Sequence, residues 1–434
     1  MAEAKGVGGV NPVRNASGAL NPARIVLKCN PAAEQRRIIS NGVKILDGNR
    51  AAAYGILLSR PDVITSYPIT PQTPLLETLY RFQADGLLDA EMVETEGENT
   101  SMSILLGASA AGGRTFTATS SQGLSFMNDA YLQAAGNRFP IVMVIGMREQ
   151  VTPHGVVTGQ QDAVSVKDHG WIQIFTESSQ EILDSIIMAY RLAEDDEILL
   201  PVNVCYEGFY LSHHSQRVEV PEQEDVDEFL APLKSMKRQK FTLEEPSIFS
   251  SYTVPGELYT EYRFKACAAQ QRAKAKFDQI DKEFGEKFGR YYGGQIEEYR
   301  TEDAEVVIVT MGCSTGTAKV VIDKKRDEGL KVGLIKIRMF RPSPREKLIK
   351  ALNGKKVIGV IDRNVCFGWN CGHNFLELKT LLSDLQTPQP LLLDFIGGLG
   401  GCDITFRDVE RVIDRTIAAG KGEPHQTVTW LSLE

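Results

Sequence analysis

Two series of short apolar runs alternate with longer segments of helical character, and this alternation constrains the fold more than any other feature of the chain. A helical segment such as 180–194 carries apolar side chains every three or four residues. Strands that alternate with helices form parallel sheets with helices packed on them. The sequence therefore predicts an α/β protein with two doubly wound parallel-sheet domains. The apolar runs lie at 63–67, 115–119, 141–145 and 199–204 in the first series, and at 306–310, 332–337, 357–361 and 391–395 in the second.

Shifts in composition divide the 434 residues into four segments. Residues 1–38 are rich in Gly, Asn, Ala and Pro without a sustained apolar period, which is typical of a flexible extension. We expect the first α/β domain over 39–212 and the second over 304–434. Between them, 213–303 holds an acidic loop and a charge-dense helical stretch. We expect this segment to be a charged helical connector that packs between the domains with a solvated face.

Charge and cysteine usage exclude several classes of function. Lys and Arg total 48 against 56 Asp and Glu, a net charge of −8, so no general basic field attracts nucleic acid or an anionic membrane. The apolar runs are far shorter than the roughly 18–20 residues that cross a bilayer. Seven cysteines in no short-spaced framework and six scattered histidines predict neither a disulfide scaffold nor a metal site in this chain. We expect a cytoplasmic protein that binds neither nucleic acid nor membrane.

The most distinctive local motif is YPITPQTP, residues 67–74, directly after an apolar run. Thr70 occupies the position of a helix N-cap and Pro71 that of the first helical residue, so a hydroxyl and free backbone N–H groups gather at the carboxyl end of a strand. Anionic ligands favour such a place. Plain helix capping explains most turns of this kind, and the motif alone leaves both interpretations open.

Three carboxylates, Glu94, Glu96 and Glu98, lead into an apolar helix of small residues that we expect over 100–112. A carboxylate at such a junction can be partly buried, and it then needs a donor or shares a proton. Glutamates also gather at helix N-termini because of the helix dipole, so the cluster alone is a weak indication of a site.

Arg148 directly follows another predicted strand. Its guanidinium can present a bidentate fork to a carboxylate ligand, or it can pair with its neighbour Glu149 and serve only the fold. The side chains that follow in a loop could wall the same crevice: His154, Gln160, Gln161 and Asp162. The residues themselves leave the two roles of Arg148 open.

Taken together, these motifs resemble the α subunits of thiamine-diphosphate-dependent 2-oxoacid:ferredoxin oxidoreductases, the pyruvate:ferredoxin oxidoreductase superfamily. The resemblance runs from about residue 44 to 419. It implies a thiamine pyrimidine-binding-type domain and a transketolase C-terminal-like domain. The matching stretches are DGN (47–49), YPITPQTP (67–74), EGEN (96–99), GAS (107–109), TFTATSSQG (115–123), DHGWIQ (168–173), RMFRP (338–342) and GLGGCDIT (398–405).

The resemblance also implies roles for individual residues. Glu98 stands where the family has a glutamate that hydrogen-bonds the aminopyrimidine ring of thiamine diphosphate and favours the tautomer that activates the thiazolium ring. Thr70 corresponds to a residue that contacts the 2-oxoacid, and Arg148 to the anchor of its carboxylate. Further cofactor contacts are expected at Tyr67, Pro68, Ile69 and Gln122, and substrate-loop contacts at His154 and Gln160.

The family holds the diphosphate with a Gly-Asp-Gly motif, which this sequence lacks. The resemblance therefore implies that thiamine diphosphate is shared with a β subunit, and that Mg²⁺ and [4Fe-4S] clusters belong to partner subunits. The implied partners are the β subunit, a γ subunit, a ferredoxin-like δ subunit and, in some members, a flavin/NAD subunit. The implied reaction is oxidative decarboxylation of a 2-oxoacid, with CoA as co-substrate, to an acyl-CoA and CO₂.

The loop after Arg148 favours a substrate other than pyruvate. Pyruvate-type relatives commonly have Asp-His-x-Asp there, whereas this chain has Gly-Gln-Gln-Asp at 159–162. The chain looks more similar to members that act on phenylglyoxylate, so an aryl-2-oxoacid is the favoured substrate and pyruvate or a branched-chain 2-oxoacid the alternative. A non-catalytic scaffold and a thiamine enzyme without ferredoxin are further alternatives. The combination of Thr70, Glu98 and Arg148 argues against the scaffold.

Overall fold

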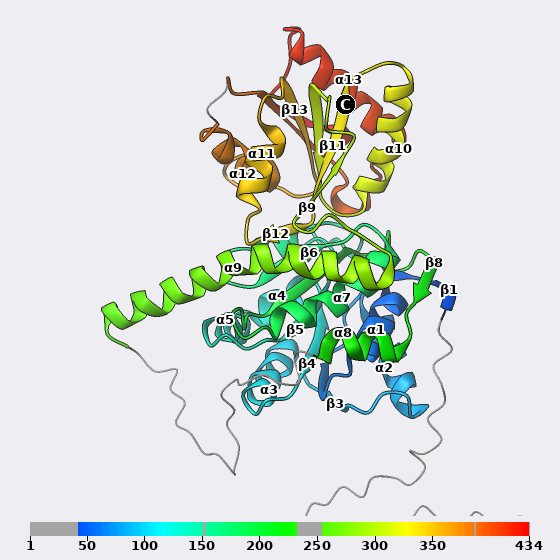
Figure 1. Cartoon of the computed structure of the whole chain (residues 1–434), viewed down its shortest axis with the longest axis vertical. Helices are drawn as coiled ribbons and strands as arrows, with labels where there is room; N and C mark the ends of the chain where they lie inside the picture. Colours follow the sequence, from blue (N-terminus) through cyan, green and yellow to red (C-terminus); the bar gives the residue numbers. More distant parts are fainter. Residues whose placement is uncertain (1–41, 151–152, 232–253, 386–387, 434) are drawn as a thin grey trace, which may run out of the picture. The chain divides into compact units, whose positions relative to one another are not determined.

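The structure is a computed structural model that describes residues 42–150, 153–231, 254–385 and 388–433. Residues 40–434 form one compact unit, drawn in Figure 1. The extension expected over 1–38 lies outside the described residues. Within the described ranges no helix is both long enough and apolar enough to cross a bilayer.

The first sheet has seven strands. Six of them run parallel, and β12 runs antiparallel to β6 at one edge. The order across the sheet is β12-β6-β7-β5-β4-β2-β3. The strands are β2 (Val63–Ser66), β3 (Glu91–Glu94), β4 (Thr115–Thr119), β5 (Val142–Met147), β6 (Ile172–Phe175), β7 (Val202–Glu207) and β12 (Met339–Arg341).

Helices cover this sheet and bury its central strands. Every residue of β4, β5 and β7 is buried, which explains why these strands are nearly continuous apolar or β-branched runs. α7 packs on β5 and β7 with α1 beside it, and α3 packs on β2 and β4 with α5 beside it. The helices are α1 (Gly48–Ser59), α2 (Thr73–Ala84), α3 (Glu98–Ala110), α4 (Ser121–Phe126), α5 (Asn128–Gly136), α6 (Gln161–Ser165) and α7 (Ser179–Ala193).

The second sheet has six strands in the order β15-β14-β13-β10-β11-β9, and β9 is antiparallel to β11. Figure 1 shows α10 and α13 beside one face of this sheet, and α11 and α12 beside the other. The strands are β9 (Ile296–Tyr299), β10 (Val306–Thr310), β11 (Val332–Ile337), β13 (Val357–Asp362), β14 (Leu391–Ile396) and β15 (Val428–Trp430). The helices are α10 (Ser314–Asp327), α11 (Arg345–Leu352), α12 (His373–Leu382) and α13 (Phe406–Gly420), with short 3-10 helices at Leu399–Gly401 and Leu431–Leu433.

The segment predicted as a charged connector forms strands and helices that pack around the two sheets. β8 (Gln216–Val220) pairs with β1 (Gly42–Leu46), and α8 (Gln223–Leu230) packs on α1 and α7. The charge-dense stretch forms α9 (Gly256–Phe288), whose Phe277 and Phe284 are buried while most charges face solvent. The limits 39–212, 213–303 and 304–434 stay a prediction of domain boundaries.

The α/β prediction is confirmed, and the runs at 115–119, 306–310 and 332–337 coincide with β4, β10 and β11. The expectation of purely parallel sheets is incomplete, because β9 and β12 each add an antiparallel edge. The physical reason lies in the chain path: after β11 the chain leaves the second sheet, contributes β12 to the first, and returns to the second through α11.

A buried ion-pair network holds this crossing in place. Lys336 and Arg338, at the end of β11 and just after it, both bond to the Glu181 carboxylate of α7 at 2.7 and 2.8 Å. Arg338 also donates to Asp281 of α9 at 2.6 Å, and its guanidinium lies 4.8 Å from the ring centre of Phe277. Burial alone would raise the pKa of Glu181, but the two cations lower it below the ordinary value. The network therefore links α7, α9 and the strand crossing.

Glu181→Gln should lower the free energy of unfolding by about 3–5 kcal/mol, because losing one partner leaves two buried cations poorly compensated. Urea-induced unfolding of wild type and variant measures the change. Asp227→Asn is the control, since it breaks the solvent-exposed pair of Arg60 and Asp227 and should cost under about 1 kcal/mol. Equal losses in the two variants would contradict a stabilising role for the buried network.

Candidate functional site

The YPITPQTP motif forms a turn at the carboxyl end of β2, and the predicted N-cap at Thr70 is wrong. α2 begins at Thr73 with Gln72 in the N-cap position, and no side chain caps it. The physical reason is that 69–72 close a separate turn, in which the Gln72 N–H donates to the carbonyl of Ile69 at 3.1 Å. Thr70 is exposed at the tip of this turn, so its hydroxyl is available to a ligand rather than to the helix.

Buried side chains fix the position of this turn. The Asn49 amide donates to the carbonyl of Pro71 at 2.9 Å, and the Tyr206 hydroxyl donates to Asn49 at 2.7 Å. Pro71 also packs against the ends of β5 and β7. A Cβ on Gly208 would crowd the proline ring, and a Cβ on Gly146 would touch it. Asn49 belongs to the DGN stretch, for which the sequence alone suggested no task.

Glu98 is the one buried carboxylate of the Glu94, Glu96 and Glu98 cluster. It lies in the first turn of α3 and is 6% exposed, whereas Glu94 and Glu96 are exposed and Glu96 accepts from the Thr100 hydroxyl at 2.6 Å. Burial raises the pKa of Glu98. Among the described residues no ion pair or side-chain hydrogen bond engages its carboxyl group.

The Glu98 carboxyl group packs closely against Gly123. Gly123, in α4, lies so close that a Cβ there would overlap both the Glu98 carboxyl and the Thr119 hydroxyl. The Thr119 hydroxyl, at the end of β4, is buried without a hydrogen-bond partner in the described structure. A hydrogen-bonding ligand at this point would satisfy groups that the protein leaves unpaired.

Arg148 directly follows β5 and is 4% exposed. One of its terminal nitrogens, Nη2, donates to the Gln122 amide oxygen at 2.7 Å, and its Nε is buried without a partner. None of the ion pairs among the described residues includes Arg148, although the charge of Asp162 partly offsets the lowering of its pKa by burial. A buried guanidinium whose contact is a neutral amide is an incomplete anion site.

Glu149 does not pair with Arg148, which answers the question that the sequence left open. Its carboxylate accepts from the backbone N–H of Gly400 at 2.9 Å, in the GLGG stretch of the second α/β part. Burial raises the pKa of Glu149, and the nearby Arg363 offsets part of that rise. The Arg148 guanidinium is therefore not neutralised by its neighbour.

The two substrate-loop candidates make no hydrogen bond to Glu98, Gln122 or Arg148 among the described residues. His154 is exposed, with no partner among the described residues. Gln160 is 1% exposed and its amide is fully used: Nε2 donates to Glu207 and to the carbonyl of Met311, both at 3.0 Å, and Oε1 accepts from Asn364. Contact of either residue with substrate stays a prediction. The hydrogen bonds of Gln160 indicate that it links the first sheet to the second.

The remaining candidates follow the edge where parallel strands end. Thr70 follows β2, Gln122 follows β4 and Arg148 follows β5, and these three strands are neighbours in the sheet. Tyr67 and Ile69 are half-buried in the turn after β2, and Pro68 is exposed. Ligands in open α/β sheets bind in the crevice outside the carboxyl ends of the strands. Sequence reasoning placed Asp162 only in the loop that could wall the crevice, and it gave Asn49 no role of its own. In the structure both side chains are buried and hydrogen-bonded, Asn49 in α1 and Asp162 in α6.

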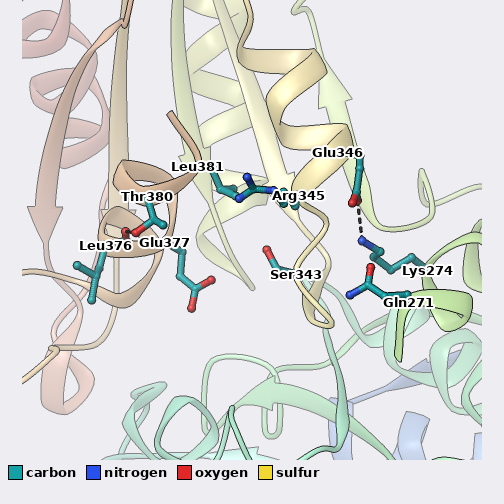
Figure 2. A pocket seen from close by; sticks show the side chains of 9 residues that line it. All are labelled: Gln271, Lys274, Ser343, Arg345, Glu346, Leu376, Glu377, Thr380 and Leu381. Atoms are coloured by element: carbon teal, nitrogen blue, oxygen red, sulfur yellow. Dashed lines mark hydrogen bonds and ion pairs between the residues drawn. The ribbon is translucent and has the colours of Figure 1, made fainter. Parts of the chain in front are cut away.

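An open pocket of about 410 Å³ lies elsewhere, between α9, α11 and α12 (Figure 2). Its charged groups already have partners: Lys274 pairs with Glu346 at 2.6 Å, and Arg345 pairs with Asp384. Since no charge in this pocket calls for a ligand, we place the candidate site at the strand ends instead.

Two family models match the chain in succession. The thiamine-diphosphate-binding domain of pyruvate flavodoxin/ferredoxin oxidoreductase matches residues 54–282, and core domain II of pyruvate:ferredoxin oxidoreductase matches 304–409. A solved 2-oxoglutarate:ferredoxin oxidoreductase from Magnetococcus marinus shares the fold with a TM-score of 0.69 and 20% identity, over 88% of this chain and 65% of that one.

Curated relatives match over nearly their whole length. The NADH-dependent phenylglyoxylate dehydrogenase subunit alpha of Aromatoleum evansii is 42% identical, over 90% of this chain and 95% of the relative. The pyruvate synthase subunit PorA of Methanothermobacter thermautotrophicus is 41% identical, and the ketoisovalerate oxidoreductase subunit VorA of Pyrococcus horikoshii 40%, each over 90% of this chain and 98% of the relative. The chain therefore belongs to the 2-oxoacid:ferredoxin oxidoreductase family, among its alpha subunits.

Proposed function

We propose that this chain supplies the substrate-anchoring and cofactor-activating residues for the CoA-dependent oxidative decarboxylation of a 2-oxoacid to an acyl-CoA and CO₂. The observation that carries the proposal is the buried Arg148 guanidinium, which lacks a carboxylate partner in the described structure. A cation removed from water without an anion is costly, so the site favours an anionic ligand. The carboxylate of a 2-oxoacid has the charge and the planar shape that match this guanidinium.

The geometry around Arg148 suits recognition of a substrate that must later lose its carboxylate. Gln122, after β4, bonds one side of the guanidinium, and the exposed Thr70 follows β2, the strand beyond β4. The carboxylate leaves as CO₂, so the arginine has to orient the bond without favouring the ground state over the transition state. A neutral partner such as Gln122 orients the fork without adding charge.

Glu98 fits the thiamine diphosphate that the family model's description names. The bound cofactor supplies the electron sink for decarboxylation. Glu98 would hold it through the aminopyrimidine ring, because burial raises the pKa of this carboxyl group and so favours sharing a proton with a ring nitrogen. Gly123, without a side chain, lets the Glu98 carboxyl lie close to α4, and the unpaired Thr119 hydroxyl offers a further hydrogen bond.

We further propose that the enzyme is complete only with partner subunits. The curated relatives are themselves named as subunits. A β subunit would bring the diphosphate half-site with Mg²⁺, and the β and ferredoxin-like δ subunits would bring the [4Fe-4S] clusters. A γ subunit and, where NADH is the product, a flavin/NAD subunit would complete the complex. The six described cysteines are free thiols, which agrees with a reducing cytoplasm.

Among substrates, we favour phenylglyoxylate or another aryl-2-oxoacid. The support is the 42% identity to a phenylglyoxylate dehydrogenase subunit, and relatives named for pyruvate and ketoisovalerate follow at 41% and 40%. A panel of 2-oxoacids assayed with CoA on the purified complex decides among them: the highest kcat/KM for pyruvate or ketoisovalerate would replace the aryl assignment.

Arg148→Ala in the assembled complex should lower kcat/KM for the 2-oxoacid by about 100-fold or more, since one partner of a buried charged pair is lost. Arg148→Lys should rescue poorly, because a point charge lacks the planar fork. Steady-state kinetics measure both. Arg81→Ala, at an exposed position on α2, is the control and should match wild type. A rise in KM below about threefold with unchanged kcat would place the anchor elsewhere.

Glu98→Gln should nearly abolish kcat, because an amide cannot share the proton, while the complex still assembles. Its thermal midpoint should equal or exceed that of wild type near pH 7: the raised pKa of Glu98 means that its charged form weakens the fold as pH rises through that pKa. Glu96→Gln is the control on the exposed side of the same turn. Wild-type proton exchange at the thiazolium carbon in Glu98→Gln would contradict the assignment.

The chain on its own should bind thiamine diphosphate weakly, because half of the proposed site belongs to another subunit. Titration calorimetry of the purified chain, with and without Mg²⁺, measures this, and the assembled complex serves as the positive control. Tight, Mg²⁺-dependent binding by the lone chain would show that the shared-site proposal is wrong.

A further inference from the structure

The Asp162 carboxylate joins two strand ends of the candidate site. Asp162 lies in the first turn of α6 and is fully buried. One of its oxygens, Oδ2, accepts from the backbone N–H of Ser121 at 2.9 Å and from that of Arg148 at 3.1 Å, and the other accepts from Ala163 at 2.8 Å. A single oxygen thus bridges the residue that follows β5 and the turn that follows β4.

Both bridged positions matter for the geometry of the Arg148 guanidinium. Ser121 has φ +47°, in the left-handed region that a serine adopts only at a cost, so its conformation depends on such contacts. The next residue, Gln122, meets the Arg148 guanidinium at 2.7 Å. If the backbone at Ser121 or Arg148 relaxed, the donor and acceptor of that bond would move independently.

Asp162 is itself held from the far side by the second α/β part. The backbone N–H of Gln160 donates to the carbonyl of Arg363 at 3.2 Å, and the amide oxygen of Gln161 accepts from Val365 at 3.0 Å. Gln173 of β6 supports α6 by donating to the carbonyl of Ala163 at 2.8 Å. α6 is therefore a fixed support rather than a free loop.

A carboxylate at this place has a cost. Burial raises the pKa of Asp162 to about 7, even though three backbone N–H groups lower it, and the charge of Glu149 adds to the rise. Burying a carboxylate costs free energy. Because the Asp162 carboxylate bonds the backbone of Arg148, the proposed substrate anchor, a role at the site explains it better than packing alone.

We propose that Asp162 is a positioning residue: its carboxylate fixes the backbone of Ser121 and Arg148 and thereby sets the place of the Arg148 guanidinium. The inference rests on the proposed function of Arg148. Asp162 touches neither substrate nor cofactor in this scheme, and its effect passes through Arg148.

The test is a double-mutant cycle in the assembled complex, with Asp162→Ala and Arg148→Ala singly and together. Asp162→Ala should lower kcat/KM for the 2-oxoacid by about 10-fold or more, mainly through KM, as expected for a displaced charged hydrogen bond. The double variant should be within about threefold of Arg148→Ala, because Asp162 has nothing left to position. Independent, multiplying losses, or no loss in Asp162→Ala, would overturn the proposal.

Two further variants keep the test decisive. Asp162→Leu, which has no accepting oxygen, replaces Asp162→Ala in the cycle if the latter fails to assemble. Asp168→Asn, at an exposed position of the same segment, should match wild type.

Hydrogen exchange separates this proposal from the proposed function. In Asp162→Ala or Asp162→Leu, the amides of Ser121 and Arg148 should exchange at least about 10-fold faster than in wild type, since their shared acceptor is gone. Wild-type exchange at both amides overturns the positioning role whatever the kinetics show. Faster exchange together with an Arg148→Ala variant of full activity would support the positioning role and reject Arg148 as the substrate anchor.

Discussion

Buried charge compensation at the crossing between the two sheets is the interaction on which the rest of the structure depends. Glu181 lies fully buried between Lys336 and Arg338, and Arg338 reaches on to Asp281 of α9. Without Glu181 and Asp281 the end of β11 would carry the Arg338 cation into the interior unpaired, and Lys336 would keep only Glu177 and Glu297 as partners. With these ion pairs in place, β12 can pair at the edge of the first sheet. The loops of the candidate site and α6 then contact a second sheet whose position is fixed.

In the candidate site, by contrast, buried charged groups lack partners of opposite charge. Arg338 is surrounded by two carboxylates and an aromatic face, whereas Arg148 contacts an amide and leaves one nitrogen unpaired. Glu98 is likewise buried without an ion-pair or side-chain partner in the described structure, near the unpaired Thr119 hydroxyl. The fold thus neutralises the charges that hold it together and leaves unneutralised those at the strand ends. That contrast marks the site more clearly than any cavity does.

The sequence predicted the parts of the fold whose signal is local. TFTAT and VVIVT coincide with β4 and β10 because strands covered on both faces must be apolar or β-branched. The strand β12 could not be predicted, because three residues are too few to show an alternating pattern and their partner strand lies more than 160 positions earlier in the sequence. Thr70 was misassigned as a cap because the contact that shapes its turn comes from Asn49, far back in the chain. The motifs named Glu98 and Arg148, but only packing tells which carboxylate is buried and that Glu149 bonds elsewhere.

The strand exchange at β12 also bears on how such a chain can change over evolution. Met339 pairs with Ile174, and the Phe175 N–H donates to the carbonyl of Arg338 at 2.7 Å, so the edge of the first sheet is completed by residues encoded after the start of the second. A gene cut near residue 304 would leave β6 as an exposed edge that invites association with other chains. The two halves are therefore not interchangeable modules: a recombination that replaces the second half must also supply a matching edge strand and the cations that meet Glu181.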